Sequence, residues 1–170
     1  DATAEPGTHD RLENFPISFF AMVMGLMGLS LALHAGSVPW PALARASEAV
    51  LWIAVAAFAG IAVLYLTKWL RHADAVSWEW HHPVRLAFFP AISISLLLIA
   101  TGLLATHPGA ARAVWWAGAA GQAVLTLAVV SGWIGHRSFQ VGHLTPAWFI
   151  PAVGNVIVPD ERLRADLAQR

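Results

Sequence analysis

The stretch EWHHPVRLAFFPAIS, residues 79–93, joins a polar, charged beginning to an apolar run. From residue 86 to residue 106 the run contains no Asp, Glu, Lys or Arg. Its length is close to the ~20 residues that a helix needs to cross about 30 Å of hydrocarbon. Pro90 interrupts the run, and a proline deprives a continuing helix of one backbone N–H. The stretch therefore predicts a membrane-spanning segment that starts at a charged boundary and bends near its beginning.

Three other segments have the same character. Residues 15–33, 49–67 and 113–135 are apolar and free of formal charge. Over the whole chain 58% of the residues are hydrophobic and only 12% are charged, and the mean hydropathy is +0.61. Ordinary soluble domains carry about 25% charged residues, so this chain has too few charges to solvate a globular surface. The sequence predicts an all-α membrane protein with four complete transmembrane helices.

A fifth apolar segment begins near residue 146, but charged residues follow after about 14 positions, too few to cross a bilayer. We expect spans at about residues 15–34, 49–70, 86–106 and 113–135, and a partial fifth at 146–159. Residues 1–14 are expected to form a polar N-terminal tail and residues 160–170 a charged C-terminal tail. Short loops favour antiparallel hairpins, the first span with the second and the third with the fourth.

Lysines and arginines are unevenly divided between the two sides of the predicted membrane. The side of the N-terminus has five, Arg11, Lys68, Arg71, Arg85 and Arg137, and the opposite side has Arg45 and Arg112. Cytoplasmic loops carry the excess of basic residues in membrane proteins. The distribution predicts a multi-pass protein of the inner (plasma) membrane with a cytoplasmic N-terminus.

The prolines divide the spans into two kinds. Pro16 opens the first span, Pro90 interrupts the third and Pro151 lies in the partial fifth, whereas the second and fourth spans contain none. A proline bends a membrane helix and frees a carbonyl, which is tolerated where protein or a water-filled cavity supplies a partner. The alternation predicts proline-kinked odd helices in an inner layer and plain even helices outside. The alternative is that proline is simply commoner in membrane helices.

Polar residues inside the spans are few and neutral. Ser93 lies three positions after Pro90 and therefore shares its helix face, whereas Gln122, Thr126 and Ser131 either face the same path or join helices. The spans contain no embedded carboxylate, which argues against proton coupling and catalysis within the membrane. A neutral path can conduct anions if basic residues at its mouth attract them, and Arg85 is the best-placed candidate.

Other functions find little support in the residues. The formal net charge is zero, which implies no bulk attraction to nucleic acid, and the chain has no cysteine and therefore no thiolate metal site. Seven of the eight histidines fall at or beyond span ends and the eighth in the N-terminal tail, whereas a haem b protein holds its ligands inside facing helices. We predict no enzyme activity, no metal site and no cofactor.

Three blocks of sequence resemble a known family. They are NFPISFFAMVMGLMGLSLA (14–32), EWHHPVRLAFFPAIS (79–93) and TPAWFIPAVGN (145–155). In this order and at these separations they resemble the N-terminal half of the tellurite-resistance/dicarboxylate transporter family, which includes the slow-type anion channels of plant guard cells. The resemblance implies ten helices in five hairpins, with kinked odd helices around a pore. It also implies homotrimers and passive flow of chloride, nitrate, malate or sulfite.

The resemblance places residues by position. Pro16, Ser18 and Phe20 correspond to the inner first helix, Arg85, Phe88, Phe89 and Pro90 to the third, and Pro151, Gly154 and Asn155 to the fifth. With Ser93, these residues other than Arg85 are the predicted pore lining, and Arg85 and Glu79 the predicted pore mouth. Ser18 stands where glycine is usual, and no residue here matches the family's gating phenylalanine, which belongs to the ninth helix.

Several alternatives stay open at this level. Arg85 either draws anions inward or is paired with Glu79 for structural reasons. A chain of half the family's length is a fragment, a truncated product or a half that assembles with a second chain. A membrane-bound b-type haem protein would show a Soret band, and a non-conducting assembly partner would co-purify with another polypeptide. The expected partners are the lipid bilayer, small inorganic or dicarboxylate anions, and further copies of the chain or a second chain.

Overall fold

The computed structural model describes residues 12–82, 84–135 and 146–155, and every regular element within these ranges is a helix. Most of the expected N-terminal tail, the last four residues of the expected fifth span and the C-terminal tail lie outside the described residues, as do His9, Arg11, His136, Arg137 and His143.

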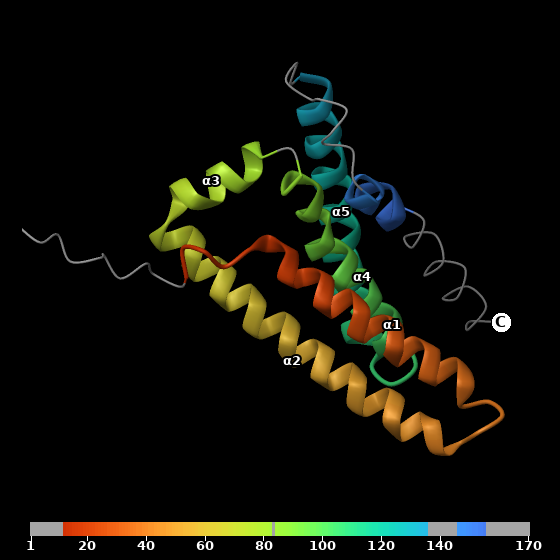
Figure 1. The fold of residues 1–170 in the computed structure, drawn as a ribbon. Helices are drawn as coiled ribbons and strands as arrows, with labels where there is room; N and C mark the ends of the chain where they lie inside the picture. Colours follow the sequence, from red (N-terminus) through yellow and green to blue (C-terminus); the bar gives the residue numbers. More distant parts are fainter. Residues whose placement is uncertain (1–11, 83, 136–145, 156–170) are drawn as a thin grey trace, which may run out of the picture.

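Two helical hairpins make up the fold (Figure 1). Helices α1 (Phe20–Gly36) and α2 (Ala42–Arg71) form the first, and α4 (Pro90–Leu103) and α5 (Pro108–Gly135) form the second. A short helix, α3 (Ala73–His81), connects them at one end of the molecule (Figure 1). Within the described residues, four helical segments are long and apolar enough to cross a membrane, and each overlaps an expected span, which confirms the predicted all-α membrane fold.

Even and odd segments differ in length. Helices α2 and α5 have 30 and 28 residues, or about 45 and 42 Å at 1.5 Å per residue. Helices α1 and α4 have 17 and 14 residues, or about 26 and 21 Å, and fall short of a hydrocarbon core of about 30 Å. A 3-10 turn precedes each of them, η1 (Ile17–Phe19) and η2 (Leu86–Phe88). The partial fifth segment repeats this plan with η4 (Pro146–Phe149) before helical residues 150–155.

The odd-segment prolines lie at these beginnings. Pro90 is the first residue of α4, Pro16 directly precedes η1, and Pro151 is the second of the helical residues 150–155. In its first turn a helix has no internal acceptor for its N–H groups, so a proline there costs no hydrogen bond. The bend expected at Pro90 therefore takes the form of a change from a 3-10 turn to an α-helix.

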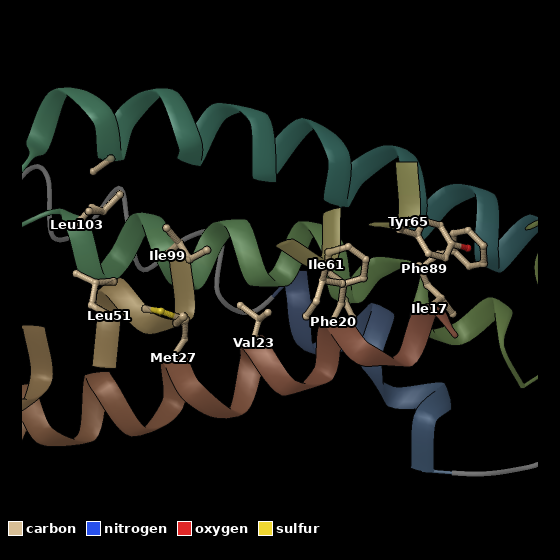
Figure 2. Close-up of a cluster of buried hydrophobic side chains, with 13 residues drawn as sticks. Ile17, Phe20, Val23, Met27, Leu51, Ile61, Tyr65, Phe89, Ile99 and Leu103 are labelled. Atoms are coloured by element: carbon tan, nitrogen blue, oxygen red, sulfur yellow. The ribbon is translucent and has the colours of Figure 1, made fainter. Parts of the chain in front are cut away.

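Helix α4 is the centre of the described fold. Of residues 86–103, which comprise η2 and α4, 67% are buried, against 28% of the corresponding window of the first span and 22% of those of the second and fourth. Figure 2 shows the main hydrophobic cluster between α1, α2 and α4, with residues such as Val23, Met27, Leu51 and Ile99 in contact. This burial places the third span inside, whereas the first span, predicted to be an inner helix, is nearly as exposed in the described part as the outer helices α2 and α5.

Serine hydroxyls join neighbouring helices within the apolar layer. Ser30 Oγ donates to Ser47 O and Ser47 Oγ donates to Ser30 O, both at 2.9 Å, so α1 and α2 exchange two hydrogen bonds. Ser95 Oγ of α4 lies 2.7 Å from Ala91 O in its own helix and 3.3 Å from Phe20 O at the start of α1. Small hydroxyl residues allow close approach and satisfy their own polar groups in lipid.

We expect Gly118→Leu to weaken the α4–α5 hairpin. A Cβ at Gly118 would lie 3.0 Å from Leu97 Cγ and 3.2 Å from Leu96 Cβ, so a larger side chain overpacks this contact. The loss should be about 1–3 kcal/mol in the free energy of unfolding, measured by SDS titration in mixed micelles. Gly60→Leu is the matched control, because a Cβ there meets nothing within 4 Å. Equal losses in both variants would contradict a packing role for Gly118.

Candidate functional site

A buried carboxylate lies where the two hairpins meet. The Glu79 side chain is 1% exposed. Its Oε1 atom lies 3.2 Å from Lys68 Nζ and 3.0 Å from Arg85 Nη1, and its Oε2 atom accepts a hydrogen bond of 2.9 Å from the Tyr65 hydroxyl. The Lys68 ammonium, also 1% exposed, donates to Phe15 O at 2.8 Å. We call Tyr65, Lys68, Glu79 and Arg85 the ion cluster.

Local structure brings these four side chains together. Tyr65 and Lys68 lie three positions apart on α2 and therefore on one face of that helix. His72, with φ −135° and ψ 56°, leaves the helical region and separates α2 from α3. Helix α3 then carries Glu79 back over α2 in its last turn. Arg85 directly precedes η2, so the ion cluster connects the start of the third segment to the end of α2.

The cluster solves a problem of charge burial. An ion removed from water is costly unless it is paired and its hydrogen-bonding capacity is used. Glu79 meets two cations and one hydroxyl, and Lys68 meets one carboxylate and one carbonyl. Arg85 is different, because its side chain is 41% exposed and its guanidinium also lies 4.6 Å from the centre of the Trp78 ring. Of the two readings of Arg85, the structure shows the pairing with Glu79 directly.

An open cavity of about 390 Å³ lies beside the ion cluster. The charged residues that line it are Glu13, Lys68, Asp74, Glu79 and Arg85. Three acids and two bases give this lining a formal charge of minus one. Lys68 and Glu79 are almost fully buried, so Glu13, Asp74 and Arg85 set the charge that an ion in the cavity meets.

A second buried polar group joins the third, fourth and fifth segments. Gln122 of α5 is 1% exposed and its Oε1 atom accepts a 2.6 Å hydrogen bond from Ser93 Oγ of α4. Its Nε2 atom donates to Pro151 O at 2.9 Å and to Thr126 Oγ1 at 3.0 Å. The sequence left open whether Gln122 faces a path or joins helices, and the structure shows that it joins them.

The predicted pore-lining residues occupy different surroundings. Phe20 and Phe89 are buried at one end of the main cluster (Figure 2), where their rings lie 6.2 and 6.4 Å from that of Tyr65. Pro90, Ser93, Pro151 and Gly154 are also buried, whereas Pro16, Ser18 and Phe88 are half-buried and Asn155 is exposed. The structure brings Ser93, Pro151 and Gly154 together around Gln122. Pore lining itself stays a prediction for all of these residues.

Sequence reasoning missed Tyr65 and Lys68 as partners of Glu79. In the sequence, Lys68 counts only as one of the five basic residues on the side of the N-terminus. One signal was available, because Tyr65 is the only tyrosine of the chain and stands in an apolar helix. A buried tyrosine hydroxyl usually has a hydrogen-bond partner, so it predicts a polar group nearby.

We expect Glu79→Gln to destabilise the protein by about 3–5 kcal/mol, because it leaves the buried Lys68 ammonium without a counter-charge. Adding Lys68→Met to Glu79→Gln should recover part of this loss, since the double variant leaves neither buried charge. Arg85→Gln should cost less than Glu79→Gln, because Glu79 keeps Lys68 and Arg85 is partly in solvent. SDS titration of these three variants and of the single Lys68→Met variant measures these differences. Additive losses in the double variant would refute the pairing.

Comparisons with known proteins agree with this membrane architecture. An uncharacterized transporter of Methanocaldococcus jannaschii is 26% identical over 150 residues, covering 87% of this chain and 44% of the relative. A tellurite resistance protein TehA homolog of Haemophilus influenzae is 30% identical over 139 residues, covering 81% and 42%. An S-type anion channel of Arabidopsis thaliana is 33% identical over 104 residues, covering 54% and 15%.

The chain spans less than half the length of each of these relatives. The family model described as voltage-dependent anion channel matches residues 14–160, which include all four long apolar helices and both buried polar groups. The chain therefore belongs to the voltage-dependent anion channel family.

Proposed function

We propose that this chain forms about half of an anion channel or passive exporter. In the assembled protein, small anions such as chloride, nitrate, malate or sulfite move through a path lined by the odd segments. The observation that carries the proposal is the central, buried α4 between longer outer helices, in a chain of an anion channel family. A homotrimer, or a second chain that completes the pore, supplies the surfaces that this half lacks.

The direction of the inner helices, rather than the charge of the cavity lining, supports anions over cations as the transported species. Helices α1 and α4 run in the same direction, since each begins at the end of the molecule that holds α3 (Figure 1). Their N-termini, which carry partial positive charge, therefore face the same side of the membrane. With a cytoplasmic N-terminus in the inner (plasma) membrane, as the basic residues favour, that side is the cytoplasm.

Within the predicted lining, we give different roles to different residues. Phe20 and Phe89 pack against Tyr65 and shape the path from behind, because they are buried in the described part. Ser18, Phe88 and Asn155 are the residues that we place closest to the path, since each keeps some exposed surface. Arg85 and Glu79 form the mouth, where Glu79 is held within the ion cluster and Arg85 faces the cavity.

Efflux from proteoliposomes loaded with chloride or malate tests the proposal. If the cavity is the mouth, Arg85→Ala should lower chloride efflux and Asp74→Asn should raise it, each by roughly threefold from the Coulomb energy of one charge in water at about 7 Å. Both effects should shrink in high salt. Arg71→Ala is the control, because Arg71 is an exposed basic residue outside the cavity lining.

The outcomes separate the parts of the proposal. Opposite changes in the Arg85 and Asp74 variants support an electrostatic mouth. A loss with Arg85→Ala but no gain with Asp74→Asn assigns Arg85 to structure alone. Absence of efflux from folded wild-type protein would contradict conduction by this chain alone and would favour a pore that a second chain completes.

A further inference from the structure

The Gln122 amide has only one orientation that satisfies its neighbours. Its two N–H groups point at Pro151 O and Thr126 Oγ1, and its oxygen points at the Ser93 hydroxyl. Reversing the amide would place the side-chain oxygen against the Pro151 carbonyl, where neither atom can donate. The Ser93 hydroxyl lies 2.6 Å from Gln122 Oε1 and 2.8 Å from Pro90 O, and it can donate its single proton to either. Both N–H groups of this buried side chain are therefore used, and its oxygen is matched when the Ser93 hydroxyl donates to it.

Gly154 fits against the same side chain. A Cβ at Gly154 would overlap the Nε2, Cδ and Oε1 atoms of Gln122. The helical residues 150–155 therefore pack directly against the Gln122 amide group. The Pro151 carbonyl accepts a hydrogen bond from Gln122 Nε2. Glycine is unfavourable within a helix relative to alanine by about 1 kcal/mol, so its presence here has a packing reason.

We propose that Gln122 is a positioning residue that fixes the third and fifth segments relative to each other. It belongs to an even, outer helix, yet it bonds Ser93 of one odd segment and Pro151 of another. If odd segments line the path, as the proposed function on which this inference rests requires, then Gln122 sets part of the path's width from behind the lining. It acts through Ser93 and Pro151 and touches no permeating ion.

The absence of cysteine in the chain permits a direct distance measurement. Nitroxide labels at Val124→Cys and Val153→Cys, which are 66% and 45% exposed, report the separation of residues 150–155 from α5, the helix against which α4 of the third segment packs. Labels at Leu29→Cys and Ile53→Cys, 51% and 57% exposed, report the α1–α2 hairpin as a reference. Gln122→Met, of similar length but without donors, should shift or broaden the first distance and leave the reference unchanged.

Two further variants keep the test specific. Thr126→Val removes a hydrogen bond within α5 only and should leave the first distance unchanged. Gly154→Ala should lower the melting temperature by roughly 3 °C or more, because the new methyl group overlaps the Gln122 amide. Helix propensity alone predicts the opposite, a stabilisation. Adding Gln122→Ala to Gly154→Ala should restore part of that loss, because the shorter side chain leaves room for the new methyl group.

The label distances test the positioning role of Gln122, and the efflux assay tests conduction, so each can be contradicted without the other. An unchanged label distance in Gln122→Met, or a stabilising Gly154→Ala, overturns the positioning role whether or not the chain conducts. A shifted distance together with a changed chloride-to-malate efflux ratio supports it. A shifted distance with an unchanged ratio overturns the control of path width. Wild-type protein without efflux contradicts the proposed function for this chain alone, while the distances still decide the positioning role.

Discussion

The buried Glu79 carboxylate is the constraint on which the arrangement of the two hairpins depends. It meets Lys68 from the end of α2 and Arg85 from the start of the third segment, and Lys68 in turn bonds the Phe15 carbonyl before the first 3-10 turn. Through these contacts one acid fixes the beginnings of two odd segments at the same level. A buried charge is tolerated only where hydrogen bonds and counter-charges compensate its loss of hydration. The Tyr65 hydroxyl supplies such a hydrogen bond to the second carboxylate oxygen of Glu79.

The polar group around Gln122 has the same architecture without formal charge. In both places a side chain outside the odd segments bonds a backbone carbonyl next to a proline, at Phe15 before Pro16 and at Pro151 itself. The ion cluster lies at the end of α2, near the expected membrane boundary, whereas Gln122 lies within the apolar length of α5. Burying a neutral amide at membrane depth costs far less free energy than burying an ion. The charged group accordingly lies near the boundary and the neutral one deeper in the apolar layer.

Composition and local pattern were enough to predict the four spans, the hairpins and the position of a proline at the start of each odd segment, whereas the predicted inner position is seen for the third span and not for the first. Those features depend on residues near one another in the chain, such as the uncharged run after Leu86 or the proline at its start. The sequence did not predict α3, because a nine-residue helix between two spans has no length or periodicity signal of its own. Nor did it predict the burial of Lys68, which requires Phe15 and Glu79 to arrive from 53 positions before it and 11 after it.

The reciprocal hydrogen bonds of Ser30 and Ser47 bear on how the protein is made. Each hydroxyl finds its acceptor on the other helix, so both are satisfied only when α1 and α2 lie together. A single helix that enters lipid by itself can satisfy its serine hydroxyl only by a hydrogen bond to its own backbone. When α1 and α2 enter as a pair, each serine hydroxyl already donates to a carbonyl of the other helix. The pairing favours release of the first two helices from the insertion machinery as one unit, before α4 has been synthesised.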